Sequence, residues 1–155
     1  MAIRIKIAQD KADFVQNLLL SANNPQGVFT TYADLIAFAA IFGKKYNYSV
    51  KLGAIAKEPS PISIDVFNSR GYEPLFKLVA ITTSNSREII SSYEENQEEL
   101  RVKIFEEYAN GGLEKLQQQL KGAVDYSERI LLILTQEKQS LSPQTKTNFD
   151  LRQFL

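Results

Sequence analysis

The stretch from Glu94 to Leu120 constrains the fold more than any other part of the chain. Apolar residues recur along it at spacings of four, and then of three and four, at Leu100, Ile104, Tyr108, Leu113, Leu116 and Leu120. These spacings are those of one face of an α-helix. Asn110-Gly111-Gly112 interrupts the pattern, and glycine readily adopts the left-handed conformation that ends many helices. The stretch therefore predicts two helices that meet at a glycine corner.

The N-terminal third of the chain predicts a strand followed by two helices. Ile3, Ile5 and Ile7 alternate with charged residues, as in a strand with one apolar face. A first helix is expected over residues 11–20. Thr31 and Asp34 then approximate a capping box in front of an almost wholly apolar segment that ends near Gly43. We expect this second helix to be central and the most deeply buried.

The remaining segments predict further helices and leave one ambiguity. Residues 61–67 fit either a strand or a helix, and a short extended piece that passes into a helical turn is favoured. If this piece is a strand, Ile3–Ile7 is its natural partner. Helices are also expected after Pro74 and after Asp125, and the last should contribute Tyr126, Ile130, Leu131, Ile133 and Leu134 to the core.

These patterns together predict a mainly α fold. We expect residues 1–138 to form a single-domain helical bundle of about six helices, with or without a short N-terminal two-stranded β ribbon. Residues 139–155 are expected to be a polar C-terminal tail that docks in part through its apolar residues. A chain of 155 residues is long enough to bury roughly two-thirds of its surface in one core.

Composition removes several classes of chemistry. The chain has no cysteine and no histidine, which excludes thiol nucleophiles, Ser-His-Asp triads and the common zinc sites. We therefore predict no catalytic residue, no metal and no cofactor. The first residues do not resemble a secretory signal, and no apolar run approaches the ~20 residues of a membrane span, so a cytoplasmic protein is expected.

Charge is balanced overall but uneven along the chain. The 18 basic and 18 acidic residues cancel, which argues against strong nonspecific attraction to DNA. Residues 1–60 nevertheless hold seven basic and four acidic residues, a net charge of +3. The basic side chains that we consider for contact with a phosphate backbone are Arg4, Lys6, Lys11, Lys44, Lys45 and Lys51.

Two sites are conceivable on the long helical stretch. The first is a recognition surface at the glycine corner, formed by Glu106, Glu107, Tyr108, Asn110, Gly111 and Gly112. The second is a catalytic or cation-binding face built from the glutamates between Glu94 and Glu107. Because Arg101 and Lys103 are interleaved and no histidine accompanies them, a solvated helix face explains these glutamates better.

Three segments together resemble a known family of small bacterial proteins. They are Phe29–Gly43 (FTTYADLIAFAAIFG), Pro61–Phe67 (PISIDVF) and Ile104–Leu113 (IFEEYANGGL). In this order they resemble the dnd system-associated protein 4 group, which accompanies DNA phosphorothioation systems. The resemblance implies a setting in which sulfur replaces a non-bridging oxygen of the DNA backbone and a linked restriction machinery attacks unmodified DNA. It implies no particular activity, so no catalytic residues are carried over.

The resemblance and the composition agree on an accessory role. The chain lacks a cysteine for sulfur transfer, a Walker-type loop and a recognisable nuclease constellation. We expect a non-enzymatic accessory or regulatory protein that acts through protein partners of the system and that also has a DNA-facing surface. The alternative is a sequence-specific DNA-binding regulator that uses the N-terminal strand or the first helices. A hydrolase that depends on the Glu94–Glu107 face is a third hypothesis.

Overall fold

The computed structural model describes residues 3–91 and 95–145, and within these ranges it contains six α-helices, two 3₁₀ helices and a two-stranded sheet. The strands are β1 (Arg4–Ile5) and β2 (Ile62–Ser63), and the 3₁₀ helices are η1 (Gln9–Lys11) and η2 (Arg87–Ile90). The α-helices are α1 (Ala12–Leu18), α2 (Tyr32–Lys45), α3 (Ile64–Ser69), α4 (Glu73–Ser84), α5 (Glu95–Leu120) and α6 (Tyr126–Thr145). The predicted mainly α class with an N-terminal β ribbon is confirmed.

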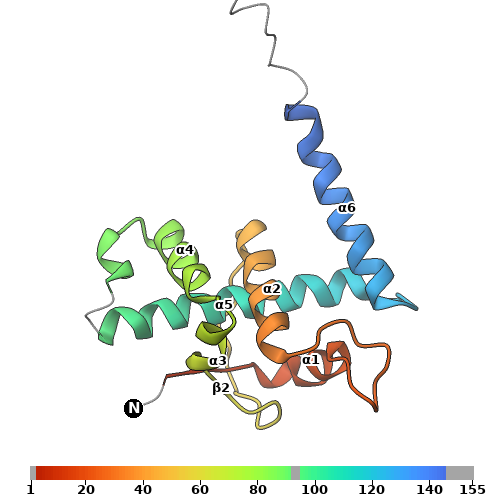
Figure 1. Ribbon diagram of the computed structural model, residues 1–155, viewed down its shortest axis with the longest axis horizontal. Coiled ribbons are helices and arrows are strands. Elements are labelled where there is room, and N and C mark those ends of the chain that lie inside the picture. Colours follow the sequence, from red (N-terminus) through yellow and green to blue (C-terminus); the bar gives the residue numbers. More distant parts are fainter. Residues whose placement is uncertain (1–2, 92–94, 146–155) are drawn as a thin grey trace, which may run out of the picture.

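Helix α5 is the rod around which the other elements are arranged. Figure 1 shows α2 and α4 lying across it, while α6 turns back after its C-terminal end and projects from the body. Leu35 and Ile36 of α2 are buried in the same apolar core as Phe105 and Leu116 of α5. The expectation that the second helix is central is therefore confirmed. Within the described ranges, every helix is too short or too polar to cross a membrane.

The predicted glycine corner is wrong, because Gly111 and Gly112 lie inside α5, which runs without a break to Leu120. A Cβ added to Gly112 would stand 1.7 Å from the carbonyl oxygen of Ala39 in α2. A Cβ on Gly43 of α2 would stand 2.1 Å from the carbonyl oxygen of Tyr108. The backbones of α2 and α5 thus touch at their crossing, and the glycines permit close approach rather than a turn.

In the first half of α5 the face that enters the core differs from the predicted one, whereas Leu113, Leu116 and Leu120 are core residues as predicted. Leu100 is 44% exposed and Ile104 only half-buried, so of the row spaced by four only Tyr108 is buried. The core face starts two residues later and comprises Val102, Phe105, Ala109, Leu113, Leu116 and Leu120. Phe105 stacks on Phe76 of α4 with ring centroids 4.0 Å apart. This stacking accounts for the burial of α5 at Phe105.

The ambiguous segment 61–67 is extended first and helical afterwards, as favoured. Ile62 and Ser63 pair antiparallel with Ile5 and Arg4, and α3 starts directly at Ile64. The Ser63 hydroxyl accepts a hydrogen bond from the Asp65 N–H at 3.3 Å. Such a side-chain cap satisfies a free donor in the first turn of the helix. The predicted pairing of this segment with the N-terminal strand is confirmed.

Asp34 in the first turn of α2 ties that helix to the turn between α3 and α4. Its carboxylate accepts two hydrogen bonds from the Arg70 guanidinium, at 2.8 and 2.6 Å, and one from the Tyr72 hydroxyl at 2.6 Å. The Asp34 N–H in turn donates to the Thr31 hydroxyl at 3.2 Å, which confirms the predicted cap. Burial raises the pKa of Asp34, but hydrogen bonds from Arg70 and Tyr72 outweigh it and lower the pKa from 3.8 to about 2.

This carboxylate makes stability depend on pH in acid. A folded-state pKa below the unfolded value stabilises the protein above pH 3.8, and the contribution is lost as the pH falls towards about 2. We expect Asp34→Asn to lower the free energy of unfolding more at pH 7 than at pH 2. The two losses should differ by roughly 1–2 kcal/mol. Urea unfolding of both proteins from pH 7 to pH 2 checks this. A difference that stays constant over that range would contradict the role of Asp34.

Helix α6 is only partly buried. Ile130 and Ile133 enter the core, whereas Leu131, Leu132 and Leu134 are largely exposed, so the expectation that all its apolar residues are core holds only in part. The Glu137 carboxylate is paired with Lys45 and accepts a hydrogen bond from the Tyr46 hydroxyl at 2.7 Å. The helix continues to Thr145, into the segment expected to be a tail. Docking of residues 146–155 lies outside the described residues.

Candidate functional site

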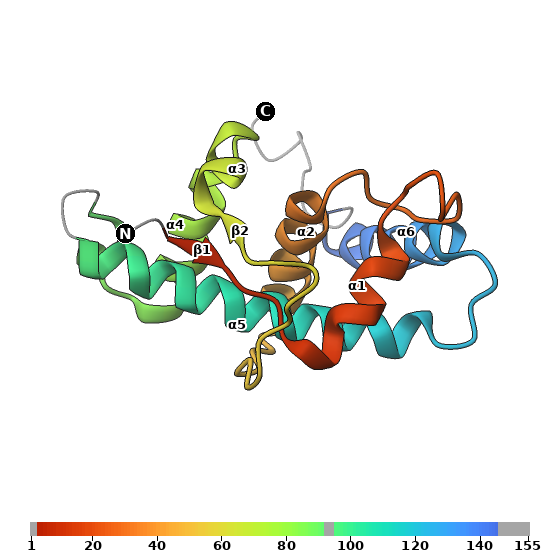
Figure 2. The ribbon, with the colours of Figure 1, turned by 90° about the horizontal axis from the view of Figure 1, so that it is seen from below.

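The candidate site is a groove of about 760 Å³ between β1, α5 and the segment from Lys51 to Pro61. It is lined by Ile3, Arg4, Lys6, Lys51, Leu52, Ile55, Pro61, Glu99, Val102, Lys103, Glu106 and Glu107. Figure 2 shows β1 running between β2 and α5. Both predicted site sets contribute to this lining, so the structure brings part of each set to one place.

Of the residues predicted for partner binding, only Glu106 and Glu107 line the groove. Tyr108, Asn110 and the two glycines are buried in the fold. The Asn110 amide donates to the carbonyl oxygens of Val50 and Lys51, both at 3.2 Å. These buried residues hold the segment around Lys51 against α5, and so they shape the groove wall from behind.

Glu106 connects the groove to β1. Its Oε1 accepts a hydrogen bond from the backbone N–H of Lys6 at 2.8 Å, and the residue as a whole is 9% exposed. Burial raises the pKa of Glu106, and the hydrogen bond from Lys6 opposes this rise in part. Glu106 is therefore a buried carboxylate that satisfies a free donor at the edge of a strand.

The predicted basic set divides among three places. Arg4, Lys6 and Lys51 line the groove. Lys11 is buried at 4% exposure and pairs with Asp10 at 2.9 Å, so it is not presented to a phosphate backbone. The other two lysines are engaged at the C-terminal end of α2.

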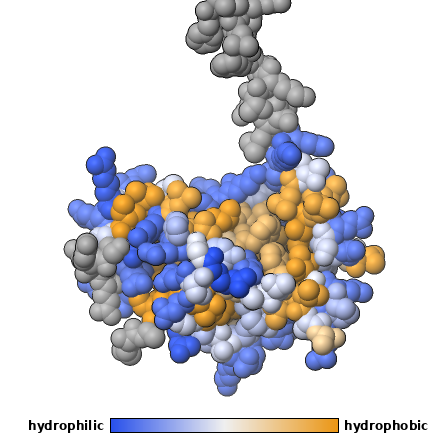
Figure 3. Space-filling model, viewed as in Figure 1, coloured by the Kyte–Doolittle hydropathy of each residue, from blue (hydrophilic) through white to orange (hydrophobic). Residues whose placement is uncertain are grey.

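At that end of α2, the Lys44 ammonium donates to the Thr83 hydroxyl at 3.1 Å, and Lys45 pairs with Glu137. Lys44 also lies over the Tyr108 ring, 4.9 Å from its centroid. These contacts link α2 to α4, α5 and α6 outside the groove. Apolar residues gather over α4 and along α6 on the face in Figure 3, with hydrophilic residues between them.

Sequence reasoning missed seven of the twelve residues that line the groove. Glu99 and Lys103 were assigned to a solvated helix face, yet Glu99, Lys103 and Glu107 follow one another at intervals of four and line one wall. That spacing was a usable signal for a shared face. Leu52 and Ile55 sit in a loop without periodicity, so no pattern marked them as lining residues.

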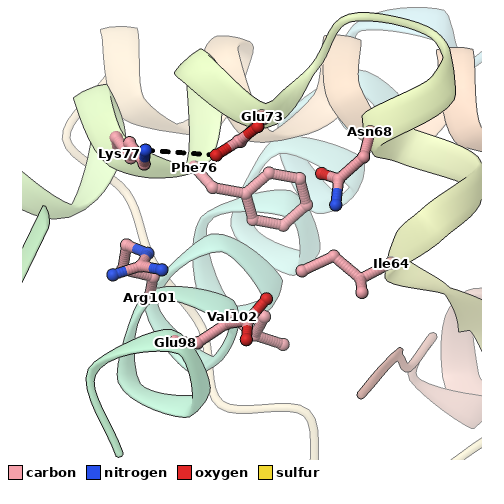
Figure 4. A pocket seen from close by; sticks show the side chains of 8 residues that line it. All are labelled: Ile64, Asn68, Glu73, Phe76, Lys77, Glu98, Arg101 and Val102. Carbon is pink, nitrogen blue, oxygen red and sulfur yellow. Dashed lines mark ion pairs between the residues drawn. The ribbon is translucent and has the colours of Figure 1, made fainter. Parts of the chain in front are cut away.

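The described glutamates in the first half of α5 divide between two hollows, with Glu106 and Glu107 in the groove. Glu99 lines the groove, whereas Glu98 borders a separate hollow of about 30 Å³ under α4. Figure 4 shows Glu98 there with Arg101 and Phe76, and with the Glu73–Lys77 ion pair of 3.1 Å. Glu94 and the side chain of Glu95 lie outside the described residues. Among the residues that are described, no cluster of three or more acidic side chains could hold a metal ion.

Comparison with protein families decides the affiliation of the chain. The family model described as DNA sulphur modification system-associated protein 4 matches residues 4–154. The chain belongs to this family. The resemblance of the three segments in Phe29–Leu113 is therefore confirmed, and the family description associates the chain with a DNA sulphur modification system. The comparison with curated proteins found no match, and neither did the comparison with solved structures.

Proposed function

We propose that this DNA sulphur modification system-associated protein is a non-enzymatic accessory or regulatory protein, which holds another protein of that system at the groove between β1 and α5. The observation that carries the proposal is the meeting of Arg4, Lys6 and Lys51 with Glu106 and Glu107 in one hollow. A cytoplasmic setting, a linked restriction machinery and a role in defence are part of the same proposal. The restriction and defence roles rest on the family association, and the cytoplasmic setting rests on the sequence expectation; the groove supports neither.

The chemistry of the groove favours a protein partner over DNA. Its four cations, Arg4, Lys6, Lys51 and Lys103, face three carboxylates, those of Glu99, Glu106 and Glu107. A phosphate backbone would meet these carboxylates at close range, which costs affinity. Apolar side chains lie between the charged ones, and a mixture of both is typical of protein interfaces.

DNA contact is the second candidate, because Arg4, Lys6, Lys51 and Lys103 gather at one site from three separate parts of the sequence. In this form the protein would be a DNA-binding regulator whose N-terminal strand lies against the duplex. Its affinity would fall steeply with salt concentration, since each neutralised phosphate releases counterions. The affinity of an operator-containing duplex at increasing salt concentrations measures this directly.

The protein-partner proposal predicts a loss of binding when the groove lysines are reversed. Lys51→Glu with Lys103→Glu places negative charge on both walls while leaving every hydrogen bond described above intact. We expect recovery of system proteins in a tagged pull-down from the native host, treated with nuclease, to fall about tenfold or more. Mass spectrometry of the recovered proteins gives the measurement.

A matched control is Lys57→Glu with Lys121→Glu, which changes the net charge equally at two exposed lysines outside the groove. Its recovery should equal that of the wild-type protein. Equal recovery by the groove variant would reject the site. Recovery of DNA alone, lost on nuclease treatment, would favour the regulator instead.

A further inference from the structure

The segment 3–7, which contains β1, is hydrogen-bonded along one edge. The Ile3 carbonyl accepts from the Ile64 N–H at 3.1 Å, and the Ile7 carbonyl accepts from the Ala56 N–H at 2.8 Å. Backbone N–H and C=O groups alternate in direction along an extended chain, so those of the odd-numbered residues point towards the segment 54–64. This edge of β1 is therefore already paired.

The opposite edge faces α5 and the groove. The Lys6 N–H points that way, because it donates to the Glu106 carboxylate of α5. Arg4 is two residues before Lys6, so its N–H and C=O share this direction. Among the described residues, no further hydrogen bond is made by the backbone groups of Arg4 and Lys6 on this edge. Such an edge is a template for another extended chain.

The groove next to this edge suits an extended peptide. Ile3, Leu52, Ile55 and Val102 offer apolar contacts, and the cations of the groove belong to the same lining. The Glu106 carboxylate already accepts a hydrogen bond from the Lys6 N–H. An added strand would therefore pair mainly with Arg4 and end at Lys6. A strand of about four residues, ~13 Å long at ~3.3 Å per residue, covers the stretch from Ile3 to Lys6.

We propose that the groove binds an extended segment of the partner protein, which adds to β1 as a third strand. The segment carries apolar side chains for the groove floor and acidic ones for its cations, and one of its residues exchanges both backbone hydrogen bonds with Arg4. Strand addition of this kind obtains affinity from main-chain hydrogen bonds and specificity from alternate side chains. This inference rests on the proposed function, since it names the form of the protein that docks there.

Arg4 allows the hydrogen bond to be tested apart from the side chain. Peptides are first selected from a phage-displayed library of random linear peptides on the full-length protein. Arg4→Ala removes the charge and the contact from Nη1 to the Pro61 carbonyl at 3.4 Å but keeps the N–H, whereas Arg4→Pro also removes the N–H. Proline is tolerated at a strand edge, and the β1–β2 ladder uses Ile5 rather than Arg4. We expect a selected peptide to bind Arg4→Pro about tenfold more weakly than Arg4→Ala.

A second measurement avoids variants of the protein. N-methylation of the selected peptide, one position at a time, should abolish binding at alternate positions and spare those between, because only every second N–H points at β1. Amide exchange of Arg4, followed by NMR, should also slow when the peptide is bound.

Four outcomes would overturn the inference. The first is that both Arg4 variants bind the peptide equally and N-methylation shows no alternation. The second is that no peptide can be selected, and the third is that duplex DNA displaces the peptide. The fourth is that the chain forms a dimer that Arg4→Pro disrupts. If the pull-down partner still depends on Lys51 and Lys103 in such a case, the proposed function stands without strand addition. If that dependence is also absent, both fail.

Discussion

Gly112→Ala is expected to destabilise the protein by about 3 kcal/mol or more, although alanine is the better helix former. In an exposed helix the exchange would gain about 1 kcal/mol. Here the new Cβ would stand 1.7 Å from the Ala39 carbonyl oxygen and 2.9 Å from the Gly43 nitrogen, which are backbone atoms and cannot rotate away. The two helices would have to separate, and this loosens the core on both sides of the crossing. Urea unfolding measures the loss, and the thermal midpoint should fall by roughly 10 °C.

A control on the same helix separates packing from helix propensity. Gln118 is exposed one turn and a half after the crossing, and Gln118→Ala should change stability by less than about 0.5 kcal/mol. Gly111→Ala should behave like Gly112→Ala, because its Cβ would lie 2.1 Å from the Tyr48 carbonyl oxygen. If Gly112→Ala were as stable as the wild-type protein, close contact between α2 and α5 would not hold in solution.

Local patterns were sufficient to predict the elements that depend on neighbours in the sequence. Alternation of Ile3, Ile5 and Ile7 gave the first strand, and the spacing of Thr31 and Asp34 gave the start of α2. Both signals act over a few residues and follow from the periods of strand and helix. The same applies to the change from strand to helix at Ile64, where Ser63 provides the cap.

The glycine pair could not be assigned from local patterns, because two physical causes give the same residue. Glycine allows a left-handed turn, and it also allows two backbones to touch. The second cause requires small residues on the partner helix, and Ala39 and Gly43 stand four residues apart on α2. The sequence contained this match, but nothing local indicates that α2 crosses α5 at Gly112.

The groove could not be predicted from the sequence for a similar reason. Lys6, Lys51 and Glu106 meet there from distant parts of the chain, and the hydrogen bond from the Lys6 N–H to Glu106 spans one hundred residues. The charge pattern identified several of its members as candidates. It placed them on two separate surfaces, because only the fold brings β1 against α5.

Phe105→Ala is expected to cost about 3–5 kcal/mol, and this would locate the core face of α5. The side chain is fully buried, stacks on Phe76 and meets the Phe67 ring edge-on at a centroid distance of 6.0 Å. Truncation leaves a cavity where α3, α4 and α5 converge, and it removes aromatic contacts in addition to buried apolar area. Urea unfolding followed by circular dichroism gives the free energy.

Leu100→Ala is the matched control, because it removes a large apolar side chain from the same helix on the face that the spacing of four predicts as core. Leu100 is 44% exposed, so the variant should lose less than about 1 kcal/mol. The ratio of the two effects distinguishes the two possible rotations of α5 about its axis. A larger loss for Leu100→Ala than for Phe105→Ala would mean that α5 is rotated about its axis. Glu106 would then point away from Lys6, and this wall of the groove would not form.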